Sequence, residues 1–180
     1  MKLTEIFSNT LNAPWVLLVL LVLTTLNTFV MVGSAPLTAF FASLVAVRRD
    51  SKWYAVSFTN ALGVSIGSMI LIYILREYGE ASMKESYPSI FESDMWSMCE
   101  TFVEKGGYAG AVLYSSLPIL LQPLVVIVAL TNKMNDITLI LCIFIGRSIK
   151  YLVMGYLTVK SGDLIESRTS ASAAGDKKLK

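Results

Sequence analysis

The chain alternates long apolar runs with short polar segments, and proline interrupts two of the runs. The first broken run extends from Trp15 to Val47 and is interrupted at Gly33 and Pro36. As one helix it would measure about 50 Å, which is too long for a single crossing of a ~30 Å hydrocarbon core. The break therefore predicts either a hairpin that enters and leaves the membrane on one face, or a full span followed by an interfacial helix.

The second broken run extends from Tyr108 to Leu130 and contains Pro118 and Pro123. Because proline interrupts the interior of a helix, this run also predicts a hairpin. Two unbroken runs, Trp53 to Leu75 and Ile137 to Val159, are each long enough to cross the hydrocarbon core. Each broken run is thus followed by a predicted span.

Hairpin, polar turn and glycine-containing span recur in the same order, which indicates an internal repeat. Pro36 and Gly63 lie 27 residues apart, and Pro118 and Gly146 lie 28 residues apart. Short basic loops favour the cytoplasmic face, so the loop at residues 48–52 is predicted to be cytoplasmic and the repeats to be inverted. Inverted repeats whose broken helices meet near the midplane are typical of secondary transporters.

The polar segment between the repeats, residues 80–105, is acidic and separates the two predicted halves. Apolar side chains recur in it at spacings of three and four, at Phe91, Met95, Met98 and Phe102. This pattern predicts an amphipathic helix that lies on the bilayer or caps the bundle.

The fold prediction is a single all-α integral membrane domain over residues 1–160. Its inverted repeats cover residues 14–79 and 106–160, each a proline-broken hairpin followed by a transmembrane helix. Residues 161–180 are rich in Ser, Ala and charge, and they are predicted to form a disordered cytoplasmic tail.

Composition supports a membrane protein and excludes several classes of site. The chain is 54% hydrophobic and 16% charged, whereas a water-soluble domain carries about 25% charged residues. A net charge of +2 does not indicate nucleic-acid binding, and the absence of histidine removes histidine-based catalysis and histidine metal sites. The two cysteines, Cys99 and Cys142, lie far apart in the sequence and suggest neither a metal site nor a disulfide framework. We therefore expect no enzyme, no metal and no cofactor.

The segment Gly63-Val-Ser-Ile-Gly67 has the spacing of a hydrolase nucleophile elbow, but it lies in an apolar helix and the chain has no histidine partner. Glycines four residues apart allow close helix–helix approach. We expect Gly63 and Gly67 to pack helices together, either in a homodimer or within one chain, and Gly146 to do the same in the second span.

The candidate site is centred on basic residues within the last span. Arg147, Lys150 and Tyr151 share one helix face, and basic residues at membrane depth are a functional-site hypothesis because their burial is costly. A guanidinium matches the oxygens of a phosphate, so Arg147 is expected to bind a lipid phosphate. Lys150 is closer to the predicted cytoplasmic side, where its side chain could equally reach the interface.

Further polar residues occur in the apolar runs, at Asn60, Ser115, Ser116 and Gln122. They either line a polar groove or satisfy backbone groups that the prolines leave without partners. Asn60 could alternatively hydrogen bond across helices.

The last four residues, Lys-Lys-Leu-Lys, include Lys177 and Lys178 in the pattern of a dilysine retrieval signal of the endoplasmic reticulum. Such a signal faces the cytoplasm and contacts a trafficking coat. Attraction of these lysines to an anionic lipid surface is the alternative.

The segments Asn60-Ala-Leu-Gly63-Val-Ser-Ile-Gly67, Gly106-Gly107-Tyr108, Leu117-Pro118 and Gly146-Arg147, with Lys150-Tyr151, resemble the DedA/VTT superfamily, which includes the SNARE-associated Golgi proteins. The resemblance covers residues 29–157. It implies a re-entrant-hairpin membrane fold and lipid scrambling or lipid-phosphate transport. Taken with the dilysine pattern, it leads us to expect residence in the endoplasmic reticulum or Golgi of a eukaryote.

Two departures from the bacterial members bear on the mechanism that the resemblance implies. Many of those proteins have a glutamate at the first hairpin, whereas residues 26–41 contain no acidic residue here. They also have an arginine before the second hairpin's proline, where this chain has Ser115 and Ser116. Both departures weaken an ion-coupled mechanism more than passive movement of lipid.

The function expected from the sequence is transbilayer movement of phospholipid or a related lipid phosphate, with membrane lipids as the partners. One alternative is a membrane scaffold in vesicle trafficking that transports nothing. The other is an ion-coupled transporter of a small solute.

Overall fold

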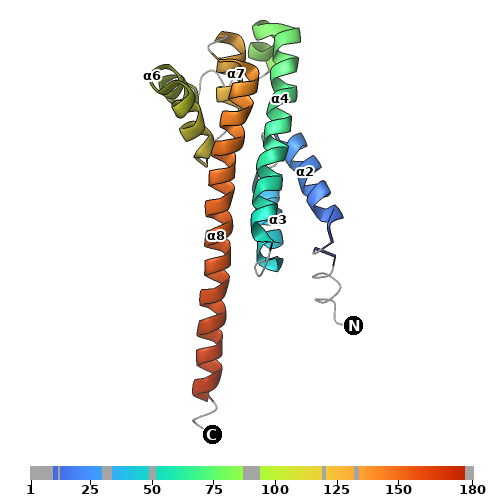
Figure 1. Cartoon of the computed structure of the whole chain (residues 1–180), viewed down its shortest axis with the longest axis vertical. Coiled ribbons are helices and arrows are strands. Elements are labelled where there is room, and N and C mark those ends of the chain that lie inside the picture. The colour runs from blue at the N-terminus through green and yellow to red at the C-terminus, as the bar shows by residue number, and fades with distance from the viewer. Residues whose placement is uncertain are drawn as a thin grey trace.

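The computed structural model describes residues 10–11, 13–29, 34–48, 52–86, 94–118, 121–131 and 134–176. Within these ranges every long regular element is a helix and no strand occurs, which confirms the all-α prediction. The helices are α2 (Trp15–Asn27), α3 (Ser34–Val47), α4 (Trp53–Ser86), α6 (Asp94–Ser116), α7 (Gln122–Thr131) and α8 (Asp136–Asp176) (Figure 1).

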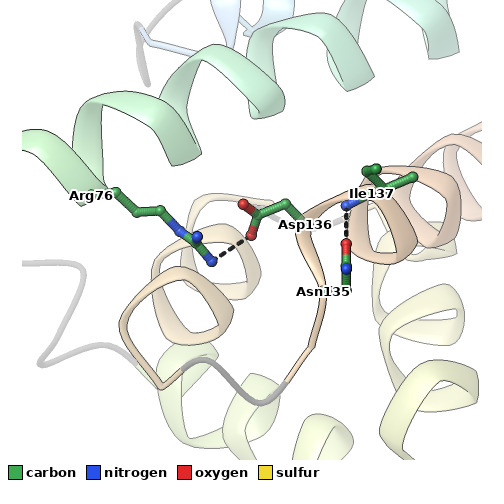
Figure 2. Close-up of polar contacts among 4 residues, drawn as sticks. All are labelled: Arg76, Asn135, Asp136 and Ile137. Atoms are coloured by element: carbon green, nitrogen blue, oxygen red, sulfur yellow. Dashed lines mark hydrogen bonds and ion pairs between the residues drawn. The ribbon is translucent and has the colours of Figure 1, made fainter.

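The antiparallel pair of α4 and α8 forms the centre of the molecule (Figure 1). At one end, Ser57 Oγ donates a hydrogen bond of 3.0 Å to the carbonyl oxygen of Tyr151. At the opposite end, Arg76 and Asp136 form an ion pair of 2.7 Å (Figure 2). We call these the Trp53 end and the Arg76 end of the molecule.

Helix α8 begins at the Arg76 end with a side-chain cap. The backbone N–H of Ile137 donates a hydrogen bond of 2.9 Å to Oδ1 of Asn135 (Figure 2). The first N–H groups of a helix have no partner within the helix, and Asn is among the residues that satisfy them best. Asn135 therefore fixes where the polar turn ends and the second long helix begins.

Helices α2 and α3 form a helical hairpin whose two ends meet at Arg48. The guanidinium of Arg48 donates to the carbonyl oxygens of Leu11, over 3.1 and 3.0 Å, and of Ala13, over 2.8 Å. The end of α3 is thereby held beside the start of α2. The other end of α2 packs on α4, where the Thr24 hydroxyl hydrogen bonds with the Asn60 side chain over 2.6 Å.

The prolines do not all occupy the breaks that the sequence suggested. Pro118 lies in the bend between α6 and α7, as expected for a break. Pro36 and Pro123 instead lie in the first turns of α3 and α7, directly after the breaks between helices. The first turn tolerates proline because its N–H groups have no partner within the helix. Gly33, the other predicted break, lies outside the described residues.

Helix α6 differs from the predicted linker helix at residues 80–105. Helix α4 continues to Ser86, and α6 runs from Asp94 to Ser116 with a sharp kink at Gly107. Its first part buries Cys99 and Val103, whereas Met98 of the predicted apolar face is exposed. Phe91 and the side chain of Met95 lie outside the described part of the chain.

Each hairpin contacts both long helices in a matching way. Helix α2 packs on α4 and α6 packs on α8, while α3 also contacts α8 and α7 contacts α4. Helix α7 is buried on all sides from Leu124 to Ala129. The long helices therefore meet a hairpin from each half of the chain.

Helix α8 continues to Asp176 and projects well beyond the other helices (Figure 1). Composition predicted disorder from Ser161 onward because the segment is rich in Ser, Ala and charge. The helix is already nucleated by the apolar residues before it, however, and residues 161–176 contain no proline that would stop it.

Both long helices expose apolar side chains along much of their length. On α8 these recur at every fourth residue, at Ile137, Leu141, Ile145, Ile149, Val153 and Leu157. On α4 they are Tyr54, Phe58, Leu62, Ile66, Met69, Ile70 and Tyr73. We call these sets the apolar stripes of α8 and α4. Each extends for about 30 Å.

Two helical segments, Trp53–Glu77 and Asp136–Leu164, are long and apolar enough to cross a membrane. Tyr54 and Tyr73 lie near the two ends of the α4 stripe, as tyrosines do at the two interfaces of a bilayer. Apolar surfaces of this extent are unusual in monomeric soluble proteins. These properties are those expected of a membrane protein.

Candidate functional site

The candidate site lies halfway along the apolar stripe of α8, where the side chain of Arg147 is only 4% exposed. Arg147 is ten residues from Ile137 and ten from Leu157, the first and last residues of the stripe, or about 15 Å from each along the axis. Burial of a charge at such a depth costs several kcal/mol unless polar groups surround it. Its surroundings therefore decide what it can do.

The end of α6 packs against α8 at the level of Arg147. A Cβ atom on Gly146 would lie 2.6 Å from Cβ of Ser115, so only glycine allows this approach. Ser115 is fully buried and Ser148 is nearly so, and neither hydroxyl has a hydrogen-bond partner among the described residues. The buried hydroxyl group of Ser148 is therefore next to Arg147 in the sequence, and that of Ser115 belongs to a residue that packs against the same helix.

Two tyrosines interact electrostatically with Arg147, Tyr114 from α6 and Tyr151 from α8 itself. Tyr114 is fully buried. The ring of Tyr151 packs against Phe41 of α3, with the ring centroids 5.3 Å apart. We refer to Arg147, Ser148, Tyr114, Ser115 and Tyr151 as the Arg147 centre. It joins elements from both hairpins to the second long helix.

Lys150 lies at the edge of this centre. It is half-buried, and its Nζ is 5.4 Å from the centroid of the Tyr151 ring. It also interacts electrostatically with Arg147. The structure thus brings together the three side chains that the sequence placed on one face, with Lys150 on the side of Arg147 nearer the Trp53 end.

Other predicted site residues lie elsewhere or have structural partners. The Ser116 hydroxyl donates a hydrogen bond of 2.7 Å to the carbonyl oxygen of Leu113 in its own helix. Asn60 is buried and joins α4 to α2 through Thr24. The side chain of Gln122 lies outside the described part of the chain. Asn60 therefore hydrogen bonds across helices, and Ser116 satisfies a backbone carbonyl oxygen of its own helix; each is one of the alternatives given for that residue.

Gly63 and Gly67 pack against α2 within the chain. A Cβ atom on Gly63 would lie 2.8 Å from the carbonyl oxygen of Leu21, and one on Gly67 would lie 2.7 Å from that of Thr25. The Thr25 hydroxyl lies 3.1 Å from the carbonyl oxygen of Gly63. Gly63 and Gly67 therefore pack two helices of the same chain together, which is one of the two alternatives given for them.

Sequence reasoning missed several residues that shape the site. Tyr114 was not identified because a tyrosine in an apolar run gives no local sign of its partners. Arg48 was interpreted as a loop residue but is buried by its main-chain partners. The series Thr24, Thr25 and Thr28 faces α4, and its spacing within an apolar run could have indicated a helix contact.

Two further predictions concern the retrieval signal and the absence of a metal site. Lys177 and Lys178 lie outside the described residues. Within the described residues, no group of three or more His, Cys, Asp or Glu side chains could hold a metal ion.

No protein-family model, curated protein or solved structure matches this chain. The resemblance to the DedA/VTT superfamily therefore stays a prediction based on the motifs described above.

Proposed function

We propose that this chain is an integral membrane protein of the DedA/VTT type that moves phospholipid, or a related lipid phosphate, across the bilayer. The observation that carries the proposal is the buried guanidinium of Arg147. It belongs to the same helix as the outward-facing apolar stripe of α8, at half the height of that stripe, which is about as long as the hydrocarbon core of a bilayer is thick. A lipid headgroup crossing hydrocarbon loses the water around its charge and polar groups, which costs many kcal/mol. A guanidinium at mid-depth would offset the phosphate charge where that cost is greatest.

The arrangement of the hairpins supports this proposal. The tip of the first hairpin contacts α4 at Gly63 and Gly67, near the middle of the α4 stripe. The tip of the second contacts α8 at Gly146, near the middle of the α8 stripe. Two re-entrant hairpins, one from each leaflet and related as inverted repeats, would shorten the purely apolar path that a headgroup has to cross.

The charges at the Trp53 end give an orientation. Arg48 and Lys52 lie at this end of α4, and Lys160 lies at the same end of α8. Short basic segments favour the cytoplasmic face. We therefore place the Trp53 end and the end of α8 in the cytoplasm, where Lys177 and Lys178 could act as a retrieval signal of the endoplasmic reticulum or Golgi.

The distribution of acidic residues favours passive movement over ion coupling. The sequence has no Asp or Glu between residues 51 and 76 or between residues 137 and 162. An ion-coupled transporter ordinarily carries such a carboxylate within the membrane. A scaffold that transports nothing would not require a phosphate-binding arginine at this depth.

The experiment is lipid scrambling in proteoliposomes that contain a fluorescent phospholipid, with dithionite to bleach the outer leaflet. We expect Arg147→Ala to slow the second phase of bleaching at least about tenfold, because a charge-assisted contact is lost. Arg147→Lys should retain part of the rate, and Lys160→Ala, which removes an exposed cation from the same helix, should leave it unchanged. An unaltered rate in Arg147→Ala would remove Arg147 from the mechanism. Wild-type vesicles that bleach no faster than protein-free vesicles would refute lipid movement and favour the scaffold.

A further inference from the structure

The structure shows the Arg147 centre in a closed form. With 4% of its side chain exposed, Arg147 cannot contact a lipid headgroup in this conformation. If a phosphate is to reach it, a segment that covers the centre has to move. The first part of α6, Asp94–Gly106, has the features of such a segment, and we refer to it as the α6 lid.

The α6 lid rests on Tyr114, the residue between it and Arg147. The ring of Phe102 meets that of Tyr114 edge to face, with the centroids 6.2 Å apart. The Cys99 side chain hydrogen bonds with Tyr114. The backbone also approaches closely, because a Cβ atom on Gly110 would overlap the carbonyl group of Phe102. The chain thus folds back on itself so that the lid covers the residue that interacts with Arg147.

The lid is held by a narrow apolar face. Cys99 and Val103 are its buried side chains, and Trp96 and Phe102 are half-buried beside them. The remainder of its described surface is mostly polar and exposed, at Asp94, Ser97, Glu100, Thr101, Glu104 and Lys105. A helix with few buried apolar contacts and a solvated opposite face belongs to the low-stability part of a structure.

A glycine hinge joins the lid to the rest of α6. Gly107 has φ 52° and ψ −128°, a conformation that other residues rarely adopt. A Cβ atom on Gly107 would meet nothing within 4 Å, so the backbone conformation alone requires glycine there. Gly106 has the same open surroundings without the positive φ.

We propose that the α6 lid closes the Arg147 centre and opens about Gly107 to admit a lipid headgroup. The effect of the lid on lipid movement rests on the function proposed above, whereas the opening itself does not. The two can therefore be tested separately.

The opening is measured by alkylation of Cys99 with N-ethylmaleimide, in the full chain reconstituted in lipid with Cys142→Ser as background. Burial raises the pKa of the Cys99 thiol to about 12, so the closed lid keeps it unreactive. We expect Gly107→Ala to raise the alkylation rate about fivefold or more, because alanine strains the folded-back backbone. Gly106→Ala is the matched control and should leave the rate unchanged.

A second variant opens the lid by a different route. In Gly110→Ala the new methyl group would overlap the backbone of Phe102 and displace the lid, so Cys99 should again react faster. Cys142, measured in a Cys99→Ser background, reports general loosening because it is buried on α8 and is not part of the lid. Unchanged alkylation of Cys99 in both glycine variants would overturn the proposal. So would an equal increase at Cys99 and Cys142.

Scrambling by the same variants tests the gating role. With active wild-type protein, Gly107→Ala should move lipid faster than Gly106→Ala. Equal rates, together with a more reactive Cys99, would show that the lid moves without controlling access and would overturn its gating role. A lack of scrambling in wild-type protein would refute the proposed function, while the alkylation result would still decide whether the lid opens.

Discussion

At the scale of single residues, the described part of the chain contains two buried arginines in different surroundings. Arg48 donates three hydrogen bonds to main-chain carbonyl oxygens, which fix its position between the two ends of the first hairpin. Arg147 is buried at half the height of the apolar stripe of α8, where Tyr114 and Tyr151 interact with it electrostatically. The first environment stabilises the fold, whereas the second is the site that we propose binds a lipid phosphate.

This difference predicts the effect of removing Arg48. Arg48→Ala deletes three donors and leaves the carbonyl oxygens of Leu11 and Ala13 without them, so the free energy of unfolding should fall by about 2 kcal/mol. Thermal unfolding in detergent, followed by far-ultraviolet circular dichroism, measures the change. Lys52→Ala, an exposed cation a few residues away, is the control and should have little effect. Equal unfolding midpoints for the two variants would contradict a stabilising role of the hydrogen bonds that Arg48 donates.

At the scale of elements, each long helix uses glycine where a hairpin touches it. Gly67 of α4 faces Thr25 and Thr28 of α2, and Gly146 of α8 faces Ser115 of α6. Between such helices, stability comes from close packing and short polar contacts more than from burial of apolar area. The hairpins are therefore sensitive to single added methyl groups.

Gly67→Ala should lower stability by about 2 kcal/mol, because its Cβ would overlap the backbone and side chains of α2. Gly106→Ala, at a glycine with open surroundings, should be neutral or slightly stabilising. Both are compared with wild type by thermal unfolding in the same detergent. If the two substitutions had the same effect, the close contact of α2 with α4 would be refuted.

The elements were predicted from the sequence to different extents, for physical reasons. The two long helices were identified because an uninterrupted apolar run is a local signal. The roles of Pro36, Pro118 and Pro123 were not separated, since proline in a bend and proline in a first helical turn look alike in sequence. The fold-back of α6 depends on the backbone conformation of Gly107, which sequence does not reveal. Arg147 was identified by its charge, whereas Tyr114 is recognisable only through its contacts.

At the scale of the whole molecule, the two apolar stripes and their ends define a layer about 30 Å thick. Lys52 and Lys160 lie at one boundary of this layer, and Arg76, Glu77 and Asp136 lie at the other. A protein that spans the bilayer in this way presents its two groups of charged residues to different compartments.

Labelling with a membrane-impermeant maleimide tests this placement in chains whose native cysteines are replaced by serine. Cysteines at Lys52 and Lys160 should react from one side of intact vesicles, and a cysteine at Glu77 only from the other. All three positions are exposed, so differences in reactivity report the side rather than burial. Reaction of all three from the same side would exclude the proposed orientation of α4 and α8.

The extension of α8 past Lys160 has a mechanical consequence. Sixteen further residues of unbroken helix place Asp176 about 24 Å farther out along the axis. Because a continuous helix is stiff, the length of α8 sets the position and the direction at which the chain leaves Asp176. Inserting one residue into this part of α8 would rotate its end by about 100° about the helix axis, whereas inserting four would nearly restore the original orientation. A receptor that binds the chain beyond Asp176 would therefore be sensitive to the rotation that an insertion causes as well as to the added length.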